Sequence, residues 1–436
     1  MVETEREPTG LREAAWVLAP ALVLGVAFGA GFIVRDCSLT CNVGFRAVPW
    51  AFLAIAALSL PMVALQVRLL AGVDFRAWQT GCAVFAALAM IGFRQWTGEA
   101  VRSNPYASSS DPVFAVQFAY LSYYVVVDPL CVLLATNLVC LGRRVYGASE
   151  AERAIAVVAA GVLGGGMLGS LLAGFVVPYL MESHFLAYET ARDHLLWVVA
   201  LCCFGYAVLA TQVAQRFPRE DPPQEAEEAS PRARLWPVLG RLAREPSLRL
   251  TFLTLSLTGV AFVQFDYLFY WVISEQVDAS QGRTGWFAMF YLVLNGASLG
   301  LLLFGTGRLL RLLGLALTLA ALPFLLVAGV GWLWAAMSVL AICGVRIARD
   351  GFTRTLYEPA IESLICRLDP ERYALIRTVL GGLGFSSGLG VGALVLLGVN
   401  ASEGPPQTVL VSVLVTLALW GGVVGLLSLR PEAQAR

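Results

Sequence analysis

The chain has 436 residues, of which 58% are hydrophobic and only 14% are charged. A soluble globular protein carries about a quarter charged residues, so this composition indicates a membrane protein whose excess apolar side chains face lipid. The formal net charge of zero argues against nucleic acid as a partner, and the absence of lysine excludes Schiff-base chemistry.

Apolar runs of about twenty residues, the length that crosses a bilayer, recur along the whole chain. An acidic N-terminal stretch precedes the first run, which predicts a permanent span rather than a cleavable signal peptide. The predicted spans cover residues 14–34, 47–70, 78–97, 113–142, 153–181, 194–214, 249–273, 284–305, 311–330, 331–348, 374–398 and 406–429. The turn Gly329-Val330-Gly331 separates the ninth span from the tenth. The expected fold is an all-α membrane protein with twelve transmembrane helices.

Residues 216–248 divide these runs into two sets of six and are rich in Pro, Glu and Arg, as in a solvated linker. The expected organisation is an N-terminal six-helix bundle over 1–215, a cytoplasmic linker over 216–248 and a C-terminal six-helix bundle over 249–436. Arginines concentrate in the loops on the linker's side of the membrane. The positive-inside rule therefore predicts that both termini are cytoplasmic, and we expect a bacterial inner membrane.

The two sets share a pattern of small residues at every fourth position. The fifth and eleventh runs carry this pattern at Gly161, Gly165 and Gly169, and at Gly384, Gly388 and Gly392. Small residues at this spacing let neighbouring helix backbones approach, a packing role that is compatible with a role in helix rocking. Six plus six helices around a central loop resemble the major facilitator superfamily, whose halves are related by an axis along the membrane normal.

A charged side chain at mid-bilayer costs about 2.5–3.5 kcal/mol by insertion scales, so each one indicates a function or a paired partner. Asp128 lies in the fourth run beside Pro129, and Asp266 lies in the seventh. One carboxylate from each set predicts a cavity lined by both sets. The alternatives are a buried ion pair for Asp128 and tyrosine hydrogen bonds for Asp266. Arg35 and Asp36 close the first run, where they either face substrate or anchor the helix end.

The other polar candidates within the spans are uncharged. Gln264 and Tyr267 flank Asp266, and Asn295 lies in the eighth run, where interhelical hydrogen bonding is the ordinary role. The chain has only two histidines, and its nine cysteines are scattered. No Ser/His/Asp set, zinc set or phosphate-binding glycine loop is recognisable. The sequence therefore predicts no enzyme, no metal and no cofactor.

Residues 344–380 are too polar to suggest burial in lipid. Arginines alternate there with aliphatic and aromatic residues at helical spacing. This pattern predicts an amphipathic helix on the cytoplasmic surface, between the tenth and eleventh spans.

Several segments resemble the ADP/ATP translocases of plastids and intracellular bacteria, together with their wider bacterial relatives. The pair Arg35-Asp36 occupies the place of a Lys-Asp motif in that family. Asp128 falls where the family has a glutamate important for transport, and Gln264 or Asp266 falls near a second glutamate. Further matches are Pro49, Ala151-x-Arg153 with residues 161–174, and Tyr357-x-Pro359 with residues 381–390.

This resemblance implies nucleotide exchange, but two positions depart from it. Arg35 replaces the family's first-span lysine, and Phe385 or Ser386 stands in place of its eleventh-span lysine. ATP carries roughly three to four negative charges, and a low-dielectric cavity must supply matching cations. The intramembrane charges named above are one arginine against three aspartates. The resemblance therefore supports fold and ancestry better than it supports nucleotide exchange.

These observations lead to the hypothesis of a secondary transporter that rocks two six-helix halves around a midplane site. The expected substrate is a small polar or anionic metabolite, with nucleotides and phosphorylated metabolites among the candidates, and a buried aspartate is expected to carry a coupling proton. The predicted substrate-binding residues are Arg35, Asp36, Asp128, Gln264, Asp266, Tyr267, Asn295 and Phe385. The alternative is a non-transporting sensor or docking module that uses the central loop and the 344–380 segment.

Overall fold

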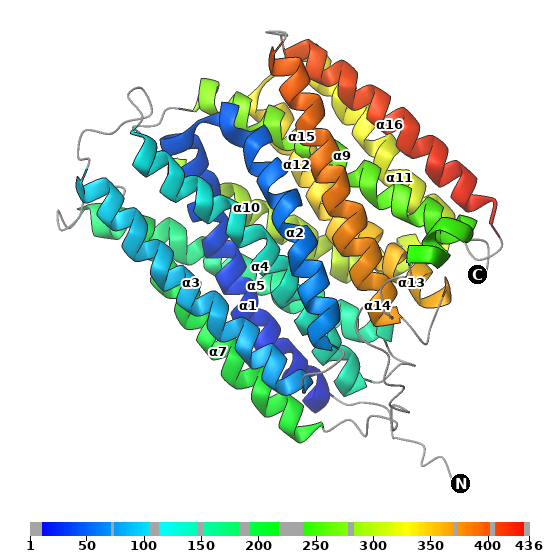
Figure 1. Ribbon diagram of the computed structural model, residues 1–436, viewed down its shortest axis with the longest axis horizontal. Coiled ribbons are helices and arrows are strands. Elements are labelled where there is room, and N and C mark those ends of the chain that lie inside the picture. The colour runs from blue at the N-terminus through cyan, green and yellow to red at the C-terminus, as the bar shows by residue number, and fades with distance from the viewer. Residues whose placement is uncertain are drawn as a thin grey trace.

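The computed structural model describes residues 11–70, 74–103, 113–146, 151–182, 192–217, 239–277, 283–368, 373–401 and 406–430. Nearly all of these residues are helical, and the helices lie side by side in one bundle (Figure 1). The described part of the chain makes twelve helical passes. The first helix begins and the last helix ends at the same end of the bundle, as an even number of passes requires.

The first six passes occupy the left and lower part of the bundle in Figure 1. They are α1 (Leu11–Ser38), α2 (Val48–Leu70), α3 (Phe75–Ser103), α4 (Phe114–Tyr146), α5 (Ala151–Glu182) and α7 (Leu195–Arg216). A π-helical turn, η1 (Leu39–Val43), extends α1, and a short 3-10 turn, η2 (Phe45–Ala47), leads into α2.

Most of the last six passes lie on the other side of the bundle, whereas α10 overlaps the first six passes in this view. They comprise α9 (Pro246–Gln276), α10 (Arg283–Leu301), η3 (Leu302–Thr306), α11 (Gly307–Ala335), α12 (Val339–Phe352), η4 (Thr353–Tyr357), α13 (Glu358–Leu368), α14 (Tyr373–Val379), η5 (Leu380–Gly384), α15 (Phe385–Ala401) and α16 (Pro406–Ser428). The elements α12, η4 and α13 follow one another without a break and make the tenth pass. In the same way α14, η5 and α15 make the eleventh.

Helix pairs of the two sets repeat the same packing. Within the first set α1 packs along α5, and within the last set α9 packs along α15. The sets meet where α5 contacts α10 and where α2 contacts α15, and Figure 1 shows α2 beside α15 in the middle of the bundle. The proposed linker, 216–248, falls mainly on residues 218–238, which lie outside the described residues.

Glycine contacts confirm the packing role predicted for the small-residue stripes. A Cβ added at Gly165 of α5 would lie 2.9 Å from the Cα of Gly25 on α1. A Cβ at Gly388 of α15 would lie 2.9 Å from the Cα of Ser256 on α9. Real Cβ atoms do not approach so closely, so both helix pairs depend on glycine at these positions.

The chain reverses between the eighth and ninth passes at Gly314. A single apolar stretch, Arg283–Ala335, contains both passes, and it is one of nine described stretches long and apolar enough to cross a membrane. Gly314 has φ 67° and ψ 176°, a backbone conformation that is essentially restricted to glycine. The predicted start of the ninth span at residue 311 therefore lies three residues before the reversal.

The predicted boundary between the ninth and tenth spans is wrong. Gly329-Val330-Gly331 lies inside α11, which continues to Ala335. The break follows at residues 336–338, and the Ser338 side chain begins α12 by accepting a hydrogen bond of 3.3 Å from the Ala341 backbone N–H. The tenth pass therefore covers Val339–Leu368 and not residues 331–348.

The surface helix predicted for residues 344–380 is consequently wrong as well. Residues 344–368 belong to the tenth pass, and residues 373–380 enter the eleventh. Arg346, Arg349 and Tyr357 are only 4%, 2% and 2% exposed. These charges are tolerated inside the bundle because carboxylates from other helices pair with them, which a sequence pattern does not reveal. The alternative of a docking module that uses this segment loses its support.

Candidate functional site

Seven charged side chains of alternating sign lie in contact with one another in the centre of the bundle. In order of contact they are Asp128, Arg35, Asp36, Arg346, Asp266, Arg349 and Asp350, and we call this set the charge chain. Asp128 lies on α4 and the next two residues on α1, whereas Asp266 lies on α9 and the remaining three on α12. The charge chain therefore crosses from the first set of passes to the last.

Asp36 is a residue at which helices of the two sets meet. Its carboxylate is fully buried and accepts hydrogen bonds from Tyr270 Oη at 2.8 Å and from Tyr291 Oη at 2.6 Å. Arg346 Nη2 donates to the same carboxylate at 3.2 Å, and Arg35 Nε donates at 2.7 Å. Three of these four donors come from the last six passes, so Asp36 fixes the position of α1 against α9, α10 and α12.

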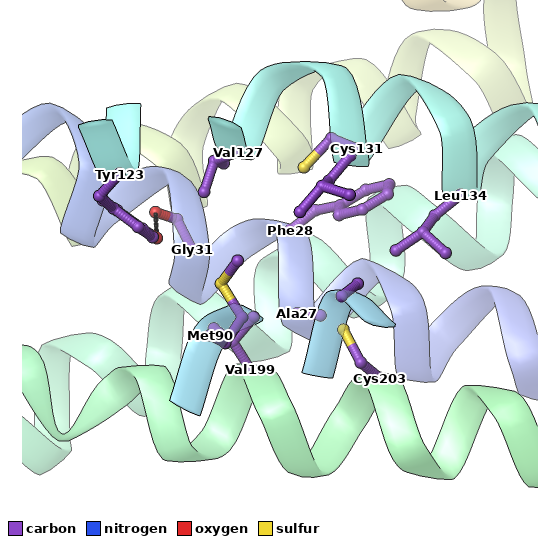
Figure 2. Close-up of a pocket in the computed structure, with 12 residues that line it drawn as sticks. Ala27, Phe28, Gly31, Met90, Tyr123, Val127, Cys131, Leu134, Val199 and Cys203 are labelled. Carbon is purple, nitrogen blue, oxygen red and sulfur yellow. Dashed lines mark hydrogen bonds between the residues drawn. The ribbon is translucent and has the colours of Figure 1, made fainter. Parts of the chain in front are cut away.

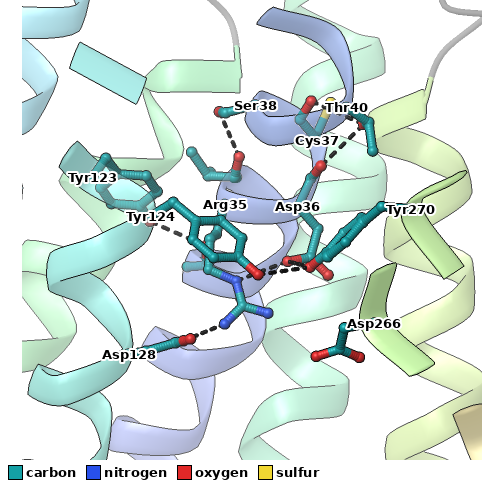
Figure 3. A network of polar contacts seen from close by, with 12 residues as sticks. Arg35, Asp36, Cys37, Ser38, Thr40, Tyr123, Tyr124, Asp128, Asp266 and Tyr270 are labelled. Carbon is teal, nitrogen blue, oxygen red and sulfur yellow. Dashed lines mark hydrogen bonds and ion pairs between the residues drawn. The ribbon is translucent and has the colours of Figure 1, made fainter. Parts of the chain in front are cut away.

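Arg35 connects Asp36 to Asp128 on the side of the first six passes. Figure 3 shows its guanidinium between the two carboxylates, where it donates to both. The rings of Phe32 and Tyr124 lie 4.7 and 4.9 Å from the guanidinium carbon. Aromatic faces stabilise a desolvated cation, so the site holds Arg35 in one orientation.

On the other side, Arg349 connects Asp266 to Asp350. It donates to Asp266 Oδ1 at 2.7 Å and to Asp350 Oδ1 at 2.6 Å. Its third donor reaches the backbone carbonyl of Phe262 at 3.2 Å, where α9 and α12 are in contact. Arg346 lies against the Phe269 ring, with 3.9 Å between its guanidinium carbon and the ring centroid.

Four of the predicted site residues, Arg35, Asp36, Asp128 and Asp266, come together in the charge chain. Each of the other four makes contacts elsewhere. Gln264 donates to Ser412 Oγ at 3.2 Å, the Tyr267 ring packs edge-on against Phe45, Asn295 accepts from Arg354 at 3.1 Å, and Phe385 packs edge-on against Phe262. Substrate binding by these four residues stays a prediction.

Sequence reasoning missed Arg346, Arg349 and Asp350, because the predicted boundary placed them at the end of a span or in a loop. One signal could have found them. Trp332 and Trp334 resemble the aromatic residues that mark a membrane interface, which would move the turn beyond residue 334 and draw the three charges into the next span. Tyr291 was missed as well, because a single tyrosine in an apolar run carries no special pattern.

The missed residues change the charge balance that the sequence suggested. The charge chain contains three guanidiniums and four carboxylates, instead of one guanidinium and three carboxylates. When every group is ionised, a single negative charge therefore remains in excess. A polyanion such as ATP still finds too few cations among these residues.

At the end of the bundle where α1 finishes, side chains from other helices contact the turn η1 and the last residues of α1. Arg283 Nη1 at the start of α10 donates to the Thr40 carbonyl oxygen at 2.7 Å. Thr284 Oγ1 lies 3.1 Å from Cys37 Sγ. Arg192 Nη1, which precedes α7, donates to Asn42 Oδ1 at 3.1 Å. The turn is thus bonded to both sets of passes.

The sets also touch on the other side of the charge chain. Arg377 of α14 donates to Thr136 Oγ1 of α4 at 3.1 Å and to Glu362 Oε1 of α13 at 2.6 Å. Thr136 lies two helical turns beyond Asp128 on α4, toward the end where α1 begins. Polar contacts between the two sets therefore lie on both sides of the charge chain.

A small pocket lies among α1, α3, α4 and α7, and its lining includes no residue of the charge chain (Figure 2). Its lining is almost wholly apolar and includes Phe28, Met90, Val127 and Leu134. The Tyr123 hydroxyl at its edge donates to the Gly31 carbonyl oxygen at 3.0 Å. The pocket offers few groups that would recognise a polar molecule.

Comparisons with known proteins identify the fold. No family model and no curated protein matches the chain. Among solved structures, the major facilitator superfamily transporter FucP in its outward conformation matches with a TM-score of 0.59 at 15% identity, covering 96% of this chain and 99% of that one. A mutant of the nucleoside transporter NupG matches with a TM-score of 0.62 at 8% identity, covering 95% of this chain and 99% of that one. The chain therefore has the all-α fold of major facilitator superfamily transporters.

Proposed function

We propose that this protein is a secondary active transporter that moves a small polar metabolite across the membrane by alternating access. The observation that carries the proposal is the charge chain, which crosses between the two sets of passes through Asp36 and Arg346. Intramembrane ionisable residues that face a bundle interior typically mark substrate or ion pathways. The fold shared with solved transporters supports the same function.

The proposed moving units are the two six-helix halves, residues 1–215 and 249–436, joined by the linker 216–248. Movement of one half against the other would break the polar contacts on one side of the charge chain while those on the other side hold. Arg283 with Thr40 and Arg377 with Thr136 are the contacts that we assign to this exchange. The proposed orientation has both termini in the cytoplasm of a bacterial inner membrane.

Substrate binding and movement are coupled through the buried ion pairs. Separating Asp36 from Arg346 without a replacement would break a buried ion pair, at a cost of about 3–5 kcal/mol. A polar substrate that contacts these residues supplies the replacement partners and lowers that cost. The excess carboxylate of the charge chain provides a place for a coupling proton.

The substrate class proposed from the sequence is a small polar or anionic metabolite. Nucleotides and phosphorylated metabolites stay among the candidates because of the resemblance to ADP/ATP translocases. A triply or quadruply charged nucleotide fits less well, since the charge chain already carries an excess negative charge.

Uptake into proteoliposomes tests this function. A panel of radiolabelled sugars, nucleosides, nucleotides, organic acids and amino acids would be offered to the purified protein. The transporter hypothesis expects saturable accumulation of at least one compound, with loss of that flux in Asp36→Asn. The exposed residue Asp74, which lies between α2 and α3, provides the control Asp74→Asn. Equal flux in liposomes with and without protein across the panel would contradict the proposal.

A test of the movement itself does not depend on the substrate. Spin labels on the ends of α5 and α10 would report the distance between the halves in double electron–electron resonance. Two distance populations support alternating access. One fixed distance, in detergent and in lipid, under all ligands, would contradict it.

A further inference from the structure

Apart from the fully buried Asp36, the carboxylates of the charge chain are more exposed than their guanidinium partners. The Asp128 side chain is 22% exposed against 9% for Arg35. The side chains of Asp266 and Asp350 are each 12% exposed, against 5% for Arg346 and 3% for Arg349. A molecule that reaches the charge chain therefore meets carboxylates from both halves first, and these favour a positively charged group.

Behind these carboxylates, Arg346 has donors that the protein leaves unused. Its Nη2 atom serves Asp36 and Tyr291, but Nη1 and Nε are buried and make no hydrogen bond among the described residues. A buried charged donor without an acceptor is costly, and a ligand oxygen at this position would remove the cost.

The contacts of Arg346 Nε are also the loosest in the charge chain. Nε lies 3.9 Å from Asp266 Oδ1 and 3.6 Å from Asp350 Oδ2, beyond hydrogen-bond distance. The hydrogen bonds of Arg349 to the same two carboxylates measure 2.7 and 2.6 Å. A ligand that enters beside Arg346 Nε and Nη1 therefore displaces no hydrogen bond of the protein.

Three ligand classes can be compared with these contacts. An anion would satisfy Arg346, but it would add to the excess negative charge and lie against Asp266. A cation would satisfy the exposed carboxylates, but it would leave the two donors of Arg346 unused. A dipolar ligand satisfies both, because its positive group pairs with a carboxylate while its negative group accepts from Arg346, and the net charge of the site is unchanged.

We propose that the substrate is a small zwitterion of the α-amino-acid type, an inference that rests on the proposed function. Its carboxylate accepts hydrogen bonds from Arg346 Nη1 and Nε. Its ammonium group donates to Asp266 and to either Asp350 or Asp128. The separation of 3.9 Å between Arg346 Nε and Asp266 Oδ1 requires the two ligand charges to be close together. An ammonium and a carboxylate on the same carbon atom meet this requirement, whereas the two ends of a long dipolar molecule do not.

Thermal unfolding of the full chain in detergent provides the first test. The probes are the twenty proteinogenic L-amino acids and, for the amino acid with the largest effect, the amine that lacks its carboxylate and the acid that lacks its ammonium group. A ligand that binds only the folded protein raises its melting temperature. We expect the amino acid to bind at least tenfold more tightly than either analogue. Equal binding by the amine or by the acid, or no stabilisation by any amino acid, would overturn the proposal.

Substitution of Arg346 provides the second test. In Arg346→Gln the binding preference for the amino acid over the amine should fall at least tenfold. Arg346→Lys should keep part of this preference, and it is the test variant if the glutamine variant does not fold. The matched control is Arg311→Gln, since Arg311 is exposed and, among the described residues, donates to its own helix at Gly307. An unchanged preference in both Arg346 variants would contradict the assigned contact.

Uptake separates a failure of this inference from a failure of the proposed function. Flux of a nucleotide, sugar or organic acid without flux of any amino acid would overturn the zwitterion and leave the transporter standing. Absence of flux for the whole panel, together with one fixed distance between the halves, would overturn both.

Discussion

Asp36 and Arg346 are 310 residues apart in the chain and meet at 3.2 Å in the centre of the protein. The first lies on α1 and the second on α12, so their contact joins the two sets of passes. Tyr291 hydrogen-bonds to both of them, at 2.6 and 3.3 Å. Any relative movement of the sets must rearrange this group of three residues.

Removal of the Asp36 charge should be strongly destabilising. In Asp36→Asn, Arg35 and Arg346 both lose an ionised partner in a buried site, and we expect a loss of about 3–5 kcal/mol in unfolding free energy. Asp74→Asn should change it by less than about 0.5 kcal/mol, because that position is exposed. Unfolding in detergent, followed by circular dichroism, measures both. Similar losses in the two variants would show that the Asp36 charge contributes no more to the free energy of unfolding than an exposed charge does.

The Asp36–Arg346 contact can be measured by a double-mutant cycle. If the two side chains interact directly, Asp36→Asn combined with Arg346→Gln should be less destabilising than the sum of the single changes. We expect a coupling energy of about 0.5–3 kcal/mol, the range typical of residues in one ion-pair network. Additive effects, within about 0.5 kcal/mol, would mean that the two residues act independently.

Arg283 and Arg377 should shift the conformational balance in opposite directions. Cys37 is fully buried beside Thr284, so its alkylation by N-ethylmaleimide reports opening at the η1 end. In Arg283→Gln a charge-assisted hydrogen bond to Thr40 is lost, and we expect Cys37 to react about tenfold faster. Mass spectrometry identifies the modified cysteine.

Arg377→Gln is the matched comparison, because Arg377 joins the sets on the other side of the charge chain. This variant should react at Cys37 more slowly than the parent protein. Equal acceleration in the two variants would instead indicate general loosening of the fold.

The contact between α1 and α5 should have no room for an additional methyl group. Gly165→Ala places a Cβ 2.9 Å from the Gly25 Cα, and overpacking of this kind costs about 1–3 kcal/mol. The neighbouring change Gly164→Ala meets only the tip of Leu22 at 3.4 Å, an ordinary contact, and should be nearly neutral. Melting temperatures of the two variants test this difference. A fall of equal size in both would reflect a general effect of the substitution and not the helix contact.

Part of the site could be predicted because a charge in an apolar run stands out. Asp128 and Asp266 were found in this way, and Arg35 with Asp36 by their place at the end of a run. Burial of the pair Arg346 and Arg349 depends on where the tenth pass begins, and a shift of about two helical turns decides whether they lie in a loop or in the core.

The contacts of Gln264 and Phe385 could not be predicted for a different reason. Both lie on helices that were placed correctly, but the direction of a side chain depends on how each helix is rotated in the bundle. Gln264 faces α16, and Phe385 packs on Phe262. Asp266, two positions from Gln264 on the same helix, reaches the charge chain, so the composition of a run does not distinguish the two positions.

The polarity of α12 has a consequence for biosynthesis. Arg346, Arg349 and Asp350 each oppose insertion of an isolated helix by about 2.5–3.5 kcal/mol. This segment therefore does not partition into lipid on its own when it leaves the ribosome. Its partner carboxylates belong to α1 and α9, which are translated earlier. The nascent chain must therefore hold those helices together at the translocon until α12 arrives, and a protein that lacks α1 should leave this segment outside the bilayer.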